Sequence, residues 1–318
     1  MSRKISILLF SLVLVMGSCA RMKGSWYLKN ERYLEGIQET KKVLAQNPND
    51  PWSNYYLGRF YLALEKPEQA LPYLRKAARL QNDNADYYFW LGVAYWAVRD
   101  FAKERSSYQM ALRADSGHVP ARLYLGHNYL DNGQWQAALR QYDKVLLEDR
   151  NNPEALYNKG LALAGLQKTD KEIKAWKAYL QHYPEGKWAL QAVDHLNSHG
   201  DFSYRNYTIG YRRITLQRIA FAPGSTELLP QSQTSLRVVG SILSINKKIQ
   251  LKIAAYHKGN SSLALARAKA VKEFLLRNYP GILPSRLSTG GYGKAERVAV
   301  NKKVFFLDQS VSLLTLKK

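Results

Sequence analysis

Cysteine is nearly absent from this sequence. Cys19 is the only one in 318 residues, so no intrachain disulfide can form. Acidic residues are also scarce, because 25 Asp and Glu stand against 47 Lys and Arg and leave a net charge of +22. Such a chain favours anionic surfaces, among them lipid phosphates, cell-wall carboxylates and nucleic acid, although the same charge can simply keep a domain soluble.

Motifs of catalysis are missing as well. The sequence has no nucleophile elbow, phosphate loop, metal-ligand cluster or pair of carboxylates at an expected strand end. The glycines of Gly290–Gly293 are not followed by the Lys-Ser/Thr pair and the helix that a phosphate loop requires. We therefore expect no enzymatic activity, no cofactor and no bound metal.

Long apolar runs are limited to the N-terminus. Ile5–Met16 is almost wholly apolar and follows the basic residues Arg3 and Lys4. The run is too short to span a bilayer as a helix, and the small residues after it are typical of a secretory signal. No later run is long enough to cross a membrane, so we expect membrane attachment through the N-terminus alone.

The end of this signal, Met16-Gly17-Ser18-Cys19, resembles a bacterial lipobox. The resemblance implies that residues 1–18 are a lipoprotein signal peptide and that Cys19 carries acyl chains, of which two or more anchor a protein stably. The residue after the cysteine is Ala20 and not Asp, which by the rule of that family favours the outer membrane, with the chain facing the periplasm. The alternative is an ordinary signal peptide cut near Ala20, which would leave a free cysteine.

Four glycines recur at intervals of 34 residues: Gly58, Gly92, Gly126 and Gly160. Large side chains recur in step with them, three residues after each glycine and again sixteen residues after it. Repeats of this length are stacked units that cannot bury their apolar faces alone. The pattern resembles the tetratricopeptide repeat (TPR). The large side chains are Tyr61, Tyr95, Tyr129 and Leu163, then Leu74, Tyr108, Tyr142 and Trp176.

The resemblance implies an all-α TPR superhelix of about five repeats over residues 19–200. Asp50 and Asn152 each stand before a proline, which is the order of an N-cap and a first helical residue. The first repeat, about 22–50, is degenerate, as expected of a terminal unit. A last helix over about 186–197 is expected to cover the other end of the array.

TPR proteins bind partners in an inner groove lined by the first helix of each repeat. Aromatic residues and an arginine stand at the matching positions, and such side chains dominate binding hot spots. We therefore predict a seat for a peptide or extended chain of an envelope protein; the alternative is that these residues pack on neighbouring helices. His127 has no second ligand at metal spacing. The matching positions are Trp52, Tyr55, Arg59, Phe89, Val93, Trp96, Leu123, His127 and Tyr157.

The pattern changes after Gly200. Residues 201–318 carry 20 Lys and Arg against 5 Asp and Glu, and strand-like segments alternate with helix-like ones. This order implies an α+β or α/β sandwich. Strands are expected at 207–209, 214–216, 249–253 and 304–307, and helices at 236–245 and 263–277.

Several stretches of this region resemble the OmpA-like peptidoglycan-binding domain. Phe221–Leu228 resembles its opening, and Asn260–Ala268 its helix entry. Gly290–Gly293 resembles the turn before the last strand of the family, and Asn301–Val304 the start of that strand. The resemblance implies an α+β OmpA-like sandwich for residues 201–318.

In that family a carboxylate and a guanidinium together bind the zwitterionic end of diaminopimelate in the peptidoglycan stem peptide. Arg267 matches the guanidinium and Asn260 keeps the helix-entry position, but Lys258 stands near the aspartate of the family. A lysine repels the ammonium group that an aspartate would hold. Peptidoglycan binding therefore stays open, beside a domain repurposed for protein contacts or for anionic groups.

Together these patterns predict a non-enzymatic outer-membrane lipoprotein scaffold. It would bind a protein partner through its TPR groove and contact the cell wall through its OmpA-like domain. The alternative is an adaptor subunit of an envelope secretion, motility or barrel-assembly complex, in which the OmpA-like domain has lost peptidoglycan binding and serves as a protein interface. Nucleic acid is not an expected partner, since a secreted lipoprotein rarely meets it.

Overall fold

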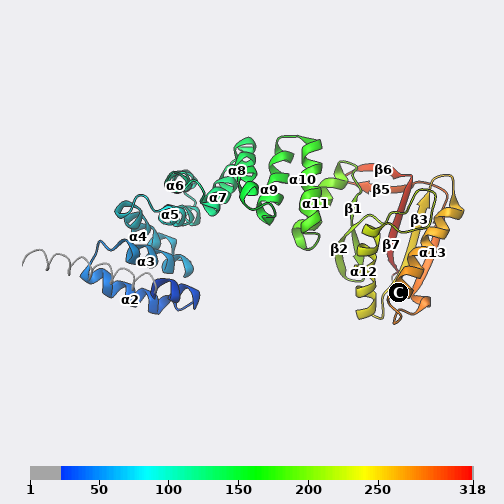
Figure 1. The fold of residues 1–318 in the computed structure, drawn as a ribbon, viewed down its shortest axis with the longest axis horizontal. Coiled ribbons are helices and arrows are strands. Elements are labelled where there is room, and N and C mark those ends of the chain that lie inside the picture. The colour runs from blue at the N-terminus through cyan, green and yellow to red at the C-terminus, as the bar shows by residue number, and fades with distance from the viewer. Residues whose placement is uncertain (1–22, 317–318) are drawn as a thin grey trace, which may run out of the picture. The chain divides into compact units, whose positions relative to one another are not determined.

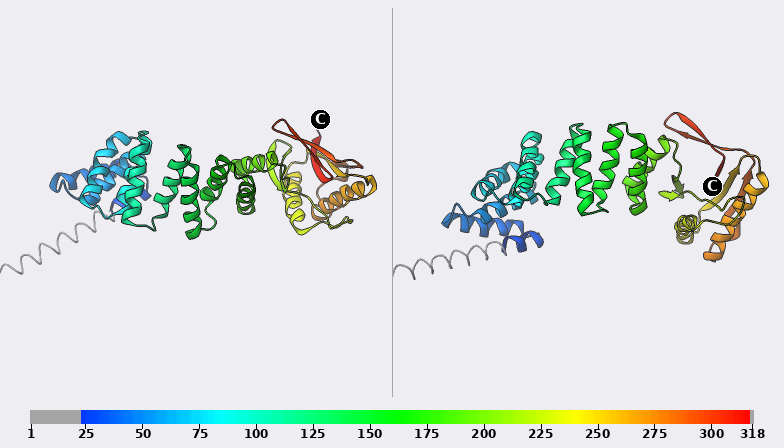
Figure 2. Two further views of the ribbon diagram at one scale, coloured as in Figure 1. Left: turned by 90° about the horizontal axis from the view of Figure 1, so that it is seen from above. Right: turned by 45° about the horizontal axis from the view of Figure 1, so that its top comes forward.

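The structure is a computed structural model that describes residues 23–316. Cys19 and the expected signal peptide lie outside the described residues. Helices fill the described chain from residue 23 to Ser198, and strands mixed with helices follow (Figures 1 and 2). The described residues divide into two compact units, on either side of the boundary between residues 150 and 151. The expected domain boundary at residue 200 stays a prediction.

The first unit is a series of paired helices. Polar side chains cap several of them: Asp50 accepts a hydrogen bond from the backbone N–H of Ser53 at 2.7 Å, and Pro51 fills the first helical position. After a helical segment at residues 23–29, the helices are α2 (Tyr33–Gln46), α3 (Pro51–Ala63), α4 (Pro67–Leu80), α5 (Ala85–Ala97), α6 (Phe101–Ala114), α7 (Val119–Asp131) and α8 (Trp135–Glu148).

The recurring glycines mark where the two helices of a pair come closest. A β-carbon added at Gly92 on α5 would overlap the ring of Tyr108 on α6, and Gly126 on α7 stands in the same relation to Tyr142 on α8. Tyr108 and Tyr142 are fully buried. The large side chain sixteen residues after each glycine therefore fills the space that the glycine leaves, which explains the strict period.

The second unit begins with three helices that lead into the strands. Glu172 on α10 is buried and joins this helix to the next one: its Oε1 accepts a hydrogen bond from Nε1 of Trp176 at 3.0 Å and lies 3.2 Å from Nδ1 of His195. Its Oε2 lies 3.1 Å from Nε2 of His199. Nδ2 of Asn206 on β1 donates to the carbonyl of Leu190 at 2.9 Å, so α11 packs on β1 and β2 as well. The three helices are α9 (Pro153–Gly165), α10 (Thr169–His182) and α11 (Gly186–Ser198).

The strands form a three-stranded sheet and two hairpins. In the sheet, β3 lies between β4 and β7, parallel to the first and antiparallel to the second. Helix α13 packs on β3 and β4, and the hairpins are β1–β2 and β5–β6 (Figure 1). The bounds are β1 (Tyr204–Ile209), β2 (Arg212–Gln217), α12 (Pro230–Ile245), β3 (Gln250–His257), α13 (Ser261–Asn278), a 3-10 turn (Pro284–Arg286), β4 (Leu287–Tyr292), β5 (Glu296–Val300), β6 (Lys303–Leu307) and β7 (Gln309–Leu316).

Two expectations drawn from the OmpA resemblance are wrong in detail. Gly290–Gly293 was expected as a turn, but most of it belongs to β4, because these residues pair in parallel with β3. Gly291 leaves room there for the backbone of Leu265 on α13. Residues 304–307 do form a strand, β6, but this strand pairs with β5 outside the three-stranded sheet. β7 takes the sheet position instead, since its Val311 and Leu313 are apolar side chains that the core buries.

A buried ion pair ties the β5–β6 hairpin to β1. The guanidinium of Arg205 donates to both carboxylate oxygens of Glu296, at 2.8 and 3.0 Å. Burial by itself would raise the pKa of Glu296, but the hydrogen bonds and charge of Arg205 outweigh it and hold that pKa below its usual value. Glu296 is thus ionised at neutral pH, which keeps this buried pair matched in charge.

Replacing Gly92 with valine tests the close helix contact. The larger side chain must displace Tyr108, so we expect a loss of about 1–3 kcal/mol of unfolding free energy, more than the small gain in helix propensity returns. Urea unfolding of the full chain measures it. Gly281→Val is the control, because a β-carbon at Gly281 meets nothing within 4 Å. Equal stability of the Gly92 variant and the unaltered chain would contradict the explanation of the period.

Candidate functional site

The first unit contains a cavity of about 750 Å³ that brings together part of the predicted groove. Arg59 from α3 and Val93 and Trp96 from α5 line it, and all three belong to the predicted set. Trp90, three residues before Val93 on the same helix face, lines it too. Leu28, Tyr33, Leu62, Ala63, Glu65, Pro67, Ala97, Arg99 and Phe101 complete the lining.

Arg59 is held in place by two aromatic neighbours. Its guanidinium carbon lies 3.4 Å from the centre of the Trp90 ring, a cation–π contact between α3 and α5. Its Nη1 donates a hydrogen bond of 2.6 Å to the hydroxyl of Tyr55. Burial raises the pKa of Tyr55 to about 12, so this phenol stays protonated and accepts the bond as a neutral group. The guanidinium of Arg59 is therefore held in one orientation at the cavity wall.

The exposed lining of this cavity combines two aromatic side chains with the charged residues Glu65 and Arg99. Trp96 is 54% exposed and Phe101 is 45% exposed, which is high for side chains of this size. Exposed aromatics beside an oriented arginine are the groups that most often anchor a bound protein segment. The cavity suits a segment with an apolar anchor next to a carboxylate or a carbonyl.

The other predicted groove residues lie between helices and do not line this cavity. Trp52 is half-buried and packs edge-on against the rings of Tyr55 and Tyr87, with ring centres 6.3 and 5.5 Å apart. Phe89 is buried against Tyr108, at 5.9 Å. Leu123 is buried as well.

His127 and Tyr157 also have packing partners. His127 is half-buried, and its ring centre lies 5.8 Å from that of Tyr142. Burial lowers the pKa of His127 to about 4, so it is neutral at pH 7 and adds no charge to a groove. Tyr157 belongs to the second unit, where its hydroxyl donates to Oε1 of Gln191 at 2.9 Å. Among the described residues, no group of His, Cys, Asp and Glu could hold a metal.

Arg267, the predicted peptidoglycan ligand, lies on α13 and is only 4% exposed. Its Nε donates to the carbonyl of Ser225 and its Nη1 to Oε1 of Gln309, both at 2.9 Å. The guanidinium also lies 4.9 Å from the ring centre of Phe221. Burial lowers the pKa of Arg267, but arginine still keeps its charge at neutral pH. In this conformation the guanidinium connects three segments of its own domain.

Asn260 and Lys258 lie in the turn before α13. Asn260 caps the helix, since its Oδ1 accepts a hydrogen bond from the backbone N–H of Leu263 at 2.8 Å. Lys258 is exposed, and its Nζ lies 3.7 Å from Oδ1 of Asp308. Asp308 precedes Gln309, the partner of Arg267, so a carboxylate stands near this site although the family position holds a lysine.

Two residues of these sites were missed by the sequence analysis. Trp90 could have been found, because it lies one helical turn from Val93 and so shares its face. Asp308 could not, because only the pairing of β3 with β7 brings it to the end of β3, far from Lys258 in the chain.

Comparison with known proteins agrees with this architecture. Residues 21–84, 55–119 and 123–187 match the tetratricopeptide repeat family and together make up more than half of the chain. The chain belongs to the tetratricopeptide repeat family. Residues 220–304 of this TPR protein match the OmpA family. A helical TPR region thus precedes a mixed α/β domain of OmpA type, as the sequence predicted, and no helix of the described residues is long and apolar enough to span a membrane.

Individual relatives match only part of this chain. BBSome complex member BBS4 of Xenopus tropicalis is 28% identical over 122 residues, which are 38% of this chain and 24% of that protein. The TPR protein therefore spans about a quarter of that relative's length.

Two solved structures share the helical fold. PilW, a widely conserved type IV pilus biogenesis factor, is 15% identical with a TM-score of 0.51, covering 58% of this chain and 88% of that chain. Pseudomonas aeruginosa pilF is 16% identical with a TM-score of 0.52, covering 58% of this chain and 85% of that chain. At such identity the likeness concerns the fold alone.

Replacing Arg267 with alanine should destabilise the OmpA-type domain. The change removes both hydrogen bonds that the buried guanidinium donates, to Ser225 and to Gln309. We therefore expect a loss of at least about 2 kcal/mol of unfolding free energy. Arg277→Ala is the control, because Arg277 is exposed on the same helix. Thermal unfolding of both variants checks the prediction, and an Arg267 variant as stable as the control would show that its hydrogen bonds add nothing to the fold.

Proposed function

We propose that this TPR protein is a non-enzymatic scaffold of the bacterial envelope. Its TPR array binds a segment of an envelope protein in the cavity beside Arg59, and its OmpA-type domain contacts peptidoglycan. Acyl chains on Cys19 hold the protein in the outer membrane, facing the periplasm. Protein binding by TPR arrays and wall binding by OmpA-type domains support the two attachments, and the Met16–Cys19 segment supports the third.

The oriented guanidinium of Arg59 is the observation that carries the protein-binding half. An arginine stacked on Trp90 has already lost most of its side-chain freedom, so less entropy is lost when a ligand binds it. Trp96 and Phe101 offer exposed apolar surface at the same cavity. A partner segment with an apolar side chain next to a hydrogen-bond acceptor would contact both this aromatic surface and the guanidinium.

The wall-binding half rests on the match to the OmpA family and on the charge of residues 201–318, with 20 Lys and Arg against 5 Asp and Glu. Peptidoglycan stem peptides end in carboxylates, which such a domain attracts over distance. The inward hydrogen bonds of Arg267 mean that wall binding through this residue requires it to exchange Ser225 or Gln309 for a ligand carboxylate.

Two observations favour a second candidate function, an adaptor subunit of an envelope secretion, motility or barrel-assembly complex. Arg267 is buried by its own domain, and Lys258 replaces the carboxylate that would hold the diaminopimelate ammonium. In the adaptor both domains would be protein interfaces, and neither would bind the wall.

A photo-crosslinker at position 96 tests protein binding in intact cells. We expect it to capture one envelope protein, and Arg59→Ala should lower the capture at least about fivefold, because a lost charged hydrogen bond costs about 1.5–3 kcal/mol. A crosslinker at Leu147, which is 77% exposed on α8 outside this cavity, is the matched control. Capture at position 96 no stronger than at position 147 would refute the cavity as the binding site.

Lys258→Asp tests wall binding. The change restores a carboxylate where the OmpA-like family has one, so we expect the full chain to sediment with peptidoglycan sacculi at least several-fold more than the unaltered chain at moderate salt. Lys269→Asp is the control, since Lys269 is exposed on α13 and loses the same charge. If neither the unaltered chain nor Lys258→Asp sediments while one protein is captured at position 96, the adaptor function holds and the scaffold is rejected.

A further inference from the structure

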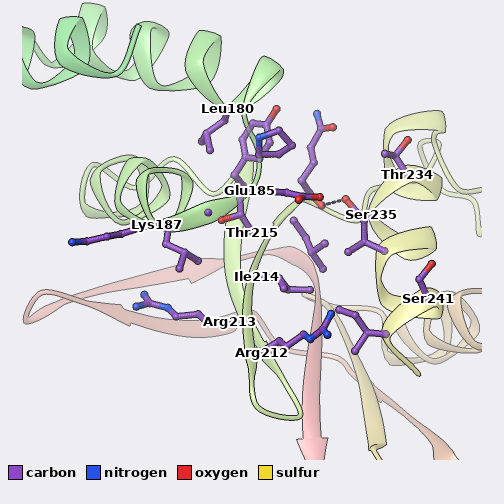
Figure 3. A pocket seen from close by; sticks show the side chains of 18 of the residues that line it. Leu180, Glu185, Lys187, Arg212, Arg213, Ile214, Thr215, Thr234, Ser235 and Ser241 are labelled. Atoms are coloured by element: carbon purple, nitrogen blue, oxygen red, sulfur yellow. Dashed lines mark hydrogen bonds between the residues drawn. The ribbon is translucent and has the colours of Figure 1, made fainter. Parts of the chain in front are cut away.

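A second cavity of about 750 Å³ lies within the second unit, and neither Arg59 nor Arg267 belongs to its lining. It is bounded by the end of α10 and the start of α11 on one side, by α12 on the other, and by β2 between them. In Figure 3 Lys187 lies on the first side, Ser235 and Ser241 on the second, and Ile214 and Thr215 of β2 in the middle. All six residues of β2 line this space, which we call the β2 groove.

The outer edge of β2 faces this groove. Among the strands that the structure describes, β2 pairs with β1 alone. The backbone N–H of Arg218 points towards the β1 side, where it donates to the carbonyl of Ser203, whereas the carbonyl of Gln217 points to α12 and accepts from Oγ of Ser235. Backbone groups of successive strand residues alternate between the two edges. The N–H and C=O groups of Arg213 and Thr215 therefore point outward, into the groove.

The two walls of the β2 groove differ in chemistry. The α12 wall carries apolar residues beside the hydroxyls of Thr234, Ser235 and Ser241. Val238 is 36% and Ile245 is 76% exposed, and Ile242 lies between them in the lining. The opposite wall presents Lys187, which is exposed at the start of α11, and the exposed Glu185 just before that helix. Arg213 belongs to this side as well, since its guanidinium lies 3.2 Å from a carboxylate oxygen of Asp194 on α11.

We propose that the β2 groove binds an extended segment of a partner protein, which adds to β2 as a third strand. Successive side chains of a strand point to opposite faces. A segment that alternates apolar and acidic residues would place the first kind on Val238 and Ile245 and the second beside Lys187 and Arg213. Main-chain hydrogen bonds to a sheet edge supply affinity in this mode, and the two walls supply specificity.

The dimensions fit a short segment. Six residues of strand extend for about 20 Å, so β2 can align about six residues of a partner. Ser235 already bonds the carbonyl of Gln217, which ends the pairing at that side of the groove. This binding mode is separate from both sites of the proposed function, so the scaffold and the adaptor could each use it.

Labelled peptides of about eight residues test the inference, one alternating valine with glutamate and one alternating valine with lysine. Fluorescence anisotropy with the full chain should show the acidic peptide binding at least about tenfold more tightly than the basic one. Bound acidic peptide should also slow amide hydrogen exchange of the Arg212–Gln217 segment, because Arg213 and Thr215 gain partners.

Two pairs of variants check the walls. Ile245→Glu and Lys187→Glu should each weaken the acidic peptide at least about tenfold, through repulsion and loss of apolar contact. Leu283→Glu, at a site that is 62% exposed outside the groove, and Lys294→Glu, also exposed and outside it, should leave affinity within about twofold. Unchanged exchange in the Ser261–Asn278 segment shows that each variant is folded.

Three results would overturn the inference. The first is equal affinity for the two peptides, and the second is no protection of the Arg212–Gln217 segment at saturating acidic peptide. The third is protection of that segment on concentrating the chain without peptide, which would mean that a second copy of the protein fills the β2 groove.

Discussion

Close contact between the two helices of each repeat is the constraint on which this protein depends. A glycine on the first helix lets the second approach until a leucine, tyrosine or tryptophan fills the space, and no β-carbon could fit there. Four repeats use such a pair sixteen residues apart, so the two helices of each of these repeats meet at the same point. In arrays of this kind each repeat is stabilised by its nearest neighbours.

The cavity beside Arg59 is a consequence of that regular stacking. The helices α3 and α5 are held one repeat apart. The guanidinium carbon of Arg59 on α3 therefore lies 3.4 Å from the centre of the Trp90 ring on α5. Neither residue could orient the other if the repeats could slide. At the end of the array a different contact fixes the helices. Buried Glu172 joins α10 to α11, and α11 in turn packs on β1 and β2. That packing creates one wall of the β2 groove.

In the OmpA-type domain, the guanidinium that was predicted to bind a ligand points into its own chain. Arg267 donates hydrogen bonds to Ser225 and Gln309. Near it, Lys258 meets Asp308 at 3.7 Å, an exposed pair that contributes little to stability and can exchange partners easily. The strongly basic surface of the domain is therefore the part that is most available to an anionic ligand.

The sequence by itself determined the repeat architecture, the helix boundaries marked by Asp50 and Asn152, and the order of a TPR array before an OmpA-type domain. These features are periodic or local, so residues close in the chain encode them. It could not separate Arg59 and Trp96, which line a cavity, from Phe89 and Leu123, which are buried between helices, because all four stand on the first helices of their repeats. It also misplaced the last sheet strand and missed Asp308. Tertiary structure alone decided these points, since burial and strand pairing depend on residues that are distant in the chain.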